Sequence, residues 1–176
     1  NAATALQPIP MGIAVSVIMG LVLTLPISSA ALAISLGLSG LAAGASTVGC
    51  CCQMVGFAVA GYCDNGVGGL LSQGLGTSMI QMPNIIRNPW IWLPPTLASA
   101  VLGPFSTVVF KMENSSIGAG MGTSGLVGQV SALGVMGAAA WPGIIVLHFA
   151  GPALLSLLFT RVLRRAGLVK AGDMRL

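Results

Sequence analysis

Long apolar runs separated by short polar breaks make up most of this chain. No residue from Asn1 to Cys63 is charged, and none from Asn114 to Thr160. Each stretch is longer than the roughly 20 apolar residues that cross a bilayer as a helix. The runs lack the alternation of a membrane β-barrel, and a backbone in hydrocarbon must satisfy its own hydrogen bonds. The pattern therefore predicts an all-α, polytopic helical bundle in a membrane.

The apolar runs divide into candidate helices at glycine, proline and polar clusters. A polar CDNG turn signature at 63–66 predicts that the segments on either side of it fold back on each other. Trp90, Trp92 and Trp141 stand near the starts of later spans, as expected at a membrane interface. The candidate spans are Pro10–Leu25, about Ala30–Val48, about Gly49–Tyr62, Ile91–Phe110 and Pro142–Phe159.

Helix breakers and amides interrupt the chain between residues 74 and 95, GLGTSMIQMPNIIRNPWIWLPP. Irregular backbone at membrane depth survives only where protein surrounds it or where it lines a wet cavity. We therefore expect residues 74–89 to form a re-entrant or broken helix facing a polar pathway. A second irregular region is uncharged and rich in glycine, at 118, 120, 122, 125, 128, 134 and 137. These glycines either let helices pack closely or leave the backbone unwound around a cavity.

Composition and charge support a membrane location. The chain is 55% hydrophobic and 6% charged, whereas soluble domains carry about 25% charged residues. The net charge of +4 comes mostly from the basic segment 161–176, and such a cluster after a hydrophobic span is expected in the cytoplasm. Nucleic acid is a less favoured partner, since the membrane already explains the basic residues.

The four cysteines, Cys50, Cys51, Cys52 and Cys63, have no metal-binding spacing. Their apolar surroundings favour a role as small packing residues over a redox or phosphocysteine role. No metal or cofactor is expected.

The second half of the chain resembles enzyme IIC, the membrane component of bacterial sugar phosphotransferase systems (PTS). Gly74-Leu75-Gly76-Thr77-Ser78 falls where cellobiose-type members carry Gly-Ile-Asn-Glu-Pro, and Asn88-Pro89 falls at their Asn-Pro. WIWLPPTLASAVLGPFSTVVF then occupies the place of the next helix, and PGIIVLHFAGPALLSLLFTRVLRR resembles the last helix with its basic end. The first half is similar to a divergent branch of these proteins.

The resemblance implies a sugar permease of the bacterial cytoplasmic (inner) membrane, acting in a phosphoenolpyruvate-dependent PTS. Its implied partners are a sugar or other small polar solute, soluble IIB and IIA phosphocarrier proteins, the lipid bilayer and a second copy in a homodimer. Enzyme IIC chains of roughly ten spans are about twice this length. We therefore expect residues 1–176 to be one membrane domain from a C-terminal half, ending in a cytoplasmic tail at 161–176.

The departures from the family motif leave a second function open. Thr77 stands where the motif has its glutamate, and Ser78 where it has proline. The resemblance implies that this glutamate helps to hold or activate a sugar hydroxyl. Its loss favours a related membrane protein with a sensing, regulatory or uncoupled solute-passage role and no phosphotransfer. Any phosphate would come from IIB, so the chain is at most the membrane subunit of a phosphotransferase.

Six residues are candidates for binding the substrate, and each also has a structural interpretation. The amides could hold sugar hydroxyls or cap broken helices, and Glu113 could replace the missing acid by reaching Gln81 and Asn84, or lie in a water-facing loop. The lone histidine could relay a proton, hold a hydroxyl or bond a neighbouring carbonyl. Arg87 and Gln53 are expected to be structural, with Arg87 reaching the interface. The candidates are Thr77, Gln81, Asn84, Asn88, Glu113 and His148.

Overall fold

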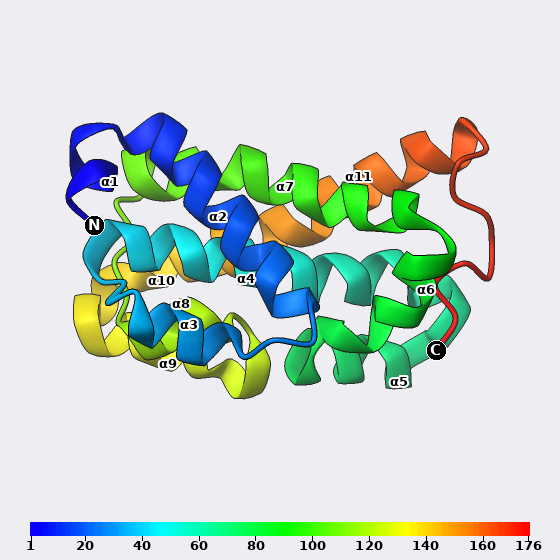
Figure 1. Ribbon diagram of the computed structural model, residues 1–176, viewed down its shortest axis with the longest axis horizontal. Helices are drawn as coiled ribbons and strands as arrows, with labels where there is room; N and C mark the ends of the chain where they lie inside the picture. The colour runs from blue at the N-terminus through cyan, green and yellow to red at the C-terminus, as the bar shows by residue number, and fades with distance from the viewer.

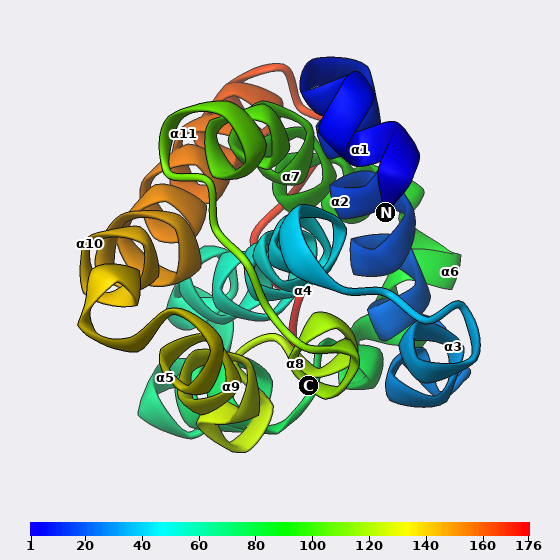
Figure 2. The ribbon, with the colours of Figure 1, turned by 90° about the vertical axis from the view of Figure 1, so that its left-hand side faces the viewer.

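The computed structural model describes residues 1–176, and its helices lie roughly along one long axis (Figure 1). Helix α4 (Gly40–Ala60) runs through the middle of the bundle and is almost wholly buried. It contacts α2 (Pro8–Thr24), α7 (Leu93–Pro104) and α11 (Gly151–Arg165), which lie around it in the end-on view (Figure 2). The predicted all-α membrane bundle is confirmed.

The central position of α4 follows from its small side chains. A side-chain carbon at Gly49 would collide with the backbone of Ser16 on α2, and one at Gly44 with the backbone of Met112. In lipid, where hydrophobicity does not drive helices together, such close backbone approach is a main source of packing energy. Cys50, Cys51 and Cys52 are fully buried on the same helix, so they fill the core as predicted.

Shorter elements complete the bundle around these four helices. The remaining α-helices are α1 (Ala2–Leu6), α3 (Ser29–Ser35), α5 (Tyr62–Leu71), α6 (Met82–Arg87), α8 (Ser116–Met121), α9 (Val127–Met136) and α10 (Trp141–Gly143). Wide π turns form η1 (Ser72–Gly76), η4 (Phe105–Val109) and η7 (Ile144–Ala150), and tight 3₁₀ turns form η2 (Ser78–Gln81), η3 (Pro89–Trp92), η5 (Ser124–Leu126) and η6 (Gly137–Ala140).

Three helical stretches are long and apolar enough to cross a membrane: Gly40–Ala60, Pro89–Val109 and Ser124–Arg165. The predicted division of residues 30–62 into spans at Ala30–Val48 and Gly49–Tyr62 is wrong. Helix α3 ends at Ser35 and α4 begins at Gly40. The helix stops because Gly37 (φ 59°) and Gly40 (φ 56°) adopt left-handed backbone, which glycine tolerates. No polar cluster marks this break in the sequence.

Two other predictions about backbone irregularity are confirmed. The chain turns near residues 61–66, where Gly66 has a φ of 59°, and η1 then packs back against α4. Residues 74–89 are not one straight helix, because they pass through η1, an extended Thr77, η2, α6 and an extended Asn88. Their proline nitrogens cannot donate helix hydrogen bonds, which suits the chain to such short turns.

The glycine-rich region shows the predicted close packing of helices together with an unwound stretch of backbone. Left-handed glycines at Gly122 and Gly125 unwind the chain between α8 and α9. A side-chain carbon at Gly120 would collide with the backbone of Ala30, so α8 packs closely on α3. These contacts hold the helices of the second half against the N-terminal ones.

Candidate functional site: an amide cluster at one end of the bundle

Residues 74–89, here called the broken segment, fold over the end of α4. Their amide side chains meet those of α5 and η1 there. The five residues, here called the amide cluster, are Asn65, Gln73, Gln81, Asn84 and Asn88. Gln81 is at its centre and is fully buried. Gln81 Nε2 donates to Gln73 Oε1 at 2.8 Å, and Gln81 Oε1 accepts from Asn84 Nδ2 at 2.9 Å. The structure thus brings the predicted candidates Gln81 and Asn84 into direct contact.

The last ten residues, Gly167–Leu176, here called the tail, lie against the amide cluster. Asn65 Nδ2 and Gln81 Nε2 both donate to the carbonyl oxygen of Met174, at 2.7 Å and 3.0 Å. Asn84 Nδ2 donates to Arg175 O at 2.9 Å, and Asn88 Nδ2 donates to Leu168 O at 2.9 Å. The amides therefore bind the main chain of the tail, a role beyond the helix capping considered from the sequence.

Two carboxylates lie beside the amide cluster. Asp173 Oδ2 accepts from Asn88 Nδ2 at 2.8 Å and from the Lys170 amide at 2.7 Å. Asp64 Oδ1 accepts from the Gly172 amide at 3.1 Å, and its Oδ2 lies 3.8 Å from an Arg164 nitrogen. Sequence reasoning missed both acids, although the adjacency of Asp64 and Asn65 was a usable signal.

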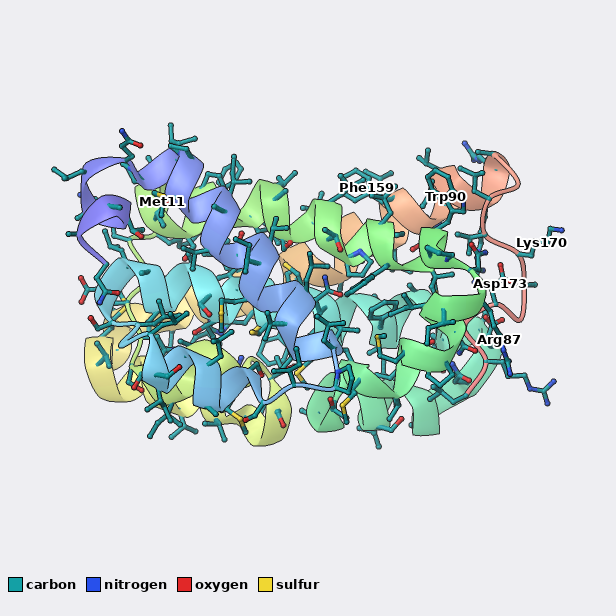
Figure 3. The ribbon with its side chains drawn as sticks, viewed as in Figure 1. Met11, Arg87, Trp90, Phe159, Lys170 and Asp173 are labelled. Atoms are coloured by element: carbon teal, nitrogen blue, oxygen red, sulfur yellow. The ribbon has the colours of Figure 1, made fainter.

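Charged side chains gather at this end of the molecule. Figure 3 shows Lys170 and Asp173 on the tail at the same end as Arg87, at the end of α6. Arg87 is exposed, as its predicted interfacial position requires. Arg87 and the basic segment 161–176 therefore form one zone of positive charge.

Hydroxyl and amide side chains continue from the broken segment across the core. Ser78 Oγ lies 2.9 Å from Thr24 Oγ1, which donates to Gln53 Oε1 at 3.3 Å. Gln53 Nε2 then donates to Thr96 Oγ1 at 3.1 Å. This polar chain joins four elements, η2, α2, α4 and α7. The sequence predicted a structural role for Gln53 but did not reveal the chain. Thr77 itself caps η2, accepting from the Met79 amide at 3.1 Å.

A shallow apolar cavity of about 380 Å³, open to the surface of the bundle, lies beside Asn88 and is lined by Leu21, Pro89, Trp90, Trp92, Leu93 and Thr96. Asn88 Oδ1 accepts from the Trp90 amide at 3.2 Å and so connects this cavity with the amide cluster. Thr96 is the last member of the polar chain described above. The cavity therefore combines aromatic surface with one hydroxyl at its wall.

The expectation that Glu113 reaches Gln81 and Asn84 is wrong. Glu113 is exposed, and the neighbouring Met112 contacts Gly44 near the start of α4. The tail residue Met174, which binds the amide cluster, packs on Phe57 and Ala60 near the other end of that helix. Sixteen residues of helix between Gly44 and Ala60 span about 24 Å. The sequence pointed to Glu113 because it is the only acid in the apolar half. Its position in the sequence does not show at which end of the bundle it lies.

His148 lies in a separate polar site on the wide turn η7. Its Nδ1 is 3.0 Å from Gln129 Nε2 of α9, and both residues are buried. Gln129 also donates to the sulfur of Cys51 at 3.5 Å. His148 Nε2 and Gln129 Oε1 have no hydrogen-bond partner. The histidine therefore bonds a side-chain amide, where the sequence suggested a backbone carbonyl, and it does not join the amide cluster.

The family model described as Phosphotransferase system, EIIC matches residues 1–176. The chain belongs to this EIIC family. The resemblance predicted from the second half is confirmed and extends over the first half as well. No curated protein and no solved structure matches the chain. Membership of this family gives the protein a permease-type role in a PTS and a location in a membrane. The general partners of the family are a sugar and a IIB protein.

Proposed function

We propose that this EIIC protein carries a sugar across the bacterial inner membrane and presents it to a IIB phosphocarrier, which in turn receives phosphate from IIA. The observation that carries the proposal is the amide cluster of the broken segment, which places buried Gln81 and Asn84 in hydrogen-bond contact beside Asn88. Side-chain amides offer both donors and acceptors, which match the paired hydroxyls of a sugar.

Each group has a distinct role in this proposal. Asn84 and Asn88 donate to sugar hydroxyls, while Gln81 orients Asn84 through their 2.9 Å hydrogen bond. Trp90 and Trp92, on the wall of the adjoining cavity, offer apolar faces for a sugar ring. Asp64 takes the place that the sequence gave to Glu113, because it is the carboxylate on α5 beside the amide cluster. Thr77 remains a helix cap near the site.

The orientation of the chain also belongs to the proposal. Arg87 and the basic residues of segment 161–176 lie at one end of the bundle, and basic residues next to membrane spans favour the cytoplasm. The amide cluster therefore faces the compartment in which IIB works. A reporter fused after Leu176 that is active only in the periplasm would contradict this orientation.

Uptake measurements test the assignment of the acid. In cells that supply phosphoenolpyruvate and the soluble PTS proteins, Asp64→Asn and Asn84→Ala should each lower uptake of a labelled sugar by about tenfold to a hundredfold. Hydrogen bonds to a charged or buried partner are worth about 1.5–3 kcal/mol. Glu113→Gln is the matched control and should leave uptake unchanged. Equal uptake in the Asp64 and Glu113 variants would contradict the proposed site.

The alternative is solute passage or sensing without phosphotransfer. It is favoured by Thr77 at the motif acid position and by the commitment of Asp64 and Asp173 to tail amides. The two functions differ in the chemical form of the sugar that enters the cell. Recovery of sugar phosphate, lost when IIB is omitted, supports the permease of a PTS, and recovery of free sugar supports the alternative.

A further inference from the structure

The donors of the amide cluster are already occupied by the chain itself. Asn65, Gln81, Asn84 and Asn88 all donate to carbonyl oxygens of the tail, from Leu168 to Arg175. The Leu176 amide also donates back to Asn65 Oδ1 at 2.8 Å. Two of them, Asn84 and Asn88, are the groups that the proposed function assigns to sugar hydroxyls. A polar solute and the tail therefore cannot occupy the amide cluster at the same time.

The tail is built so that it can separate from the bundle. It contains no helix, and Gly167 (φ 75°) and Gly172 (φ 91°) flank its central part with left-handed backbone. Only Val169 and Met174 are buried in it, whereas Lys170 and Arg175 are exposed. Segments with few buried apolar contacts open locally at a lower free-energy cost than the core helices.

Met174 is the main apolar anchor of the tail. Its side chain is fully buried and packs with Phe57, Ile85 and Ile91, and its carbonyl oxygen accepts from two amides. A change at this residue therefore acts on the tail without altering any amide of the cluster. Leucine can replace its apolar contacts, whereas asparagine places an amide in an apolar environment.

We propose that segment 167–176 is a built-in competitor that closes the amide cluster, and that polyhydroxyl solutes bind only after it leaves. The identity of the competing solute rests on the proposed function, whereas the opening of the tail does not. Because the closed form cannot bind, the measured solute affinity equals the intrinsic affinity multiplied by the open fraction. Removal of the tail leaves donors that need a new partner, which favours binding of a hydroxylated solute.

Thiol labelling measures the opening directly. In the whole chain with Cys63→Ser and Asn84→Cys, Cys50, Cys51 and Cys52 stay buried, and the new cysteine lies under the tail. We expect a hydrophilic maleimide to react about tenfold faster, or more, in the Met174→Asn variant than in the Met174→Leu variant. Deletion of residues 167–176 should give an equally fast reaction. Equal rates in the two Met174 variants would overturn the proposal.

Sugar binding, measured with Asn84 and Cys63 intact, is the second test. Across a panel of hexoses and disaccharides, Met174→Asn should bind its sugar about tenfold more tightly than Met174→Leu. Equal affinity in the two variants would overturn the competitor while leaving the proposed sugar site in place. Fast labelling combined with no sugar bound by any variant would support tail opening and count against the proposed function. The Met174 pair differs at one residue, so the comparison does not depend on the deletion variant folding.

Discussion

The two buried polar sites differ in how completely their hydrogen bonds are satisfied. In the amide cluster, Gln81 alone joins η1, α6 and the tail through both ends of its amide. In the other site, Gln129 and His148 bond each other, and one atom of each is left without a partner. Buried polar groups are normally paired, and leaving one unpaired costs about 1–3 kcal/mol. The amide cluster is therefore a closed hydrogen-bond network. Gln129 and His148 each keep one unpaired polar atom, to which a bound molecule could form a hydrogen bond.

The difference arises from the neighbours of each site. Backbone carbonyls are available at the amide cluster because the tail has no helix to use them. Gln129 and His148 have apolar neighbours that offer no donors, such as Ile144, which lines a pocket together with Gln129, and Leu147, which precedes His148 in the chain. The wide turn η7 that carries His148 is also of a kind often found at functional sites. Unpaired groups in such a turn fit a role for His148 in proton or solute movement, which remains a proposal.

Breaking the centre of the amide cluster should have the largest effect. Gln81→Leu removes the donor to Gln73 and Met174 and the acceptor for Asn84. We expect a loss of about 3 kcal/mol in unfolding free energy, because several buried groups lose their partners together. Reversible unfolding in bicelles measures this loss. Gln7→Leu, at an exposed glutamine, is the matched control, and a similar loss in both variants would contradict the closed-network interpretation.

A double-mutant cycle at the second site should give a smaller and non-additive effect. His148→Phe leaves the buried Gln129 amide with only its hydrogen bond to the Cys51 sulfur and should cost about 1–3 kcal/mol. Adding Gln129→Leu should recover most of that loss, since replacing both partners by apolar groups is nearly neutral. The same unfolding measurement yields the coupling between the two residues. Strictly additive losses would contradict direct coupling between Gln129 and His148.

The polar chain across the core should contribute less than either site. Thr24→Val keeps the shape of the side chain and removes its hydrogen bonds to Ser78 and Gln53. A loss of about 1 kcal/mol in unfolding free energy is expected, since Gln53 keeps its bond to Thr96. Thr77→Val serves as the comparison, because Thr77 caps η2 outside this chain. If Thr24→Val lowered the unfolding free energy as much as Gln81→Leu, the polar chain would be as important to stability as the amide cluster, which would contradict this ranking.

The smallest effect is expected at the residue that sequence reasoning favoured as the acid. Glu113→Gln should leave the midpoint of thermal unfolding unchanged, because the side chain is exposed and makes no hydrogen bond or ion pair. Asp64→Asn should lower the midpoint, since its carboxylate lies between Arg164 and the Gly172 amide. A lowered midpoint for Glu113→Gln alone would reverse the assignment of the acid.

The sequence by itself determined the membrane class, the family and the place where the chain is irregular. Uncharged runs longer than a bilayer span leave helices as the available structure, and Pro83, Pro89 and the nearby glycines prevent a straight helix over 74–89. Gln81 and Asn84 could be identified as candidates because amides are costly within apolar sequence unless they are paired.

Only the tertiary structure decided which polar groups meet. Asp64 and Asp173 are far apart in the chain, yet both lie at the amide cluster, whereas Glu113 lies near the opposite end of α4. The break at Gly37–Gly40 was equally hidden, because glycine is compatible with a helix as well as with left-handed backbone. Local pattern fixes where helices form, but the packing of small residues such as Gly49 on Ser16 sets how helices align. That alignment brings the tail carbonyls to the amides, and no spacing along the sequence encodes it.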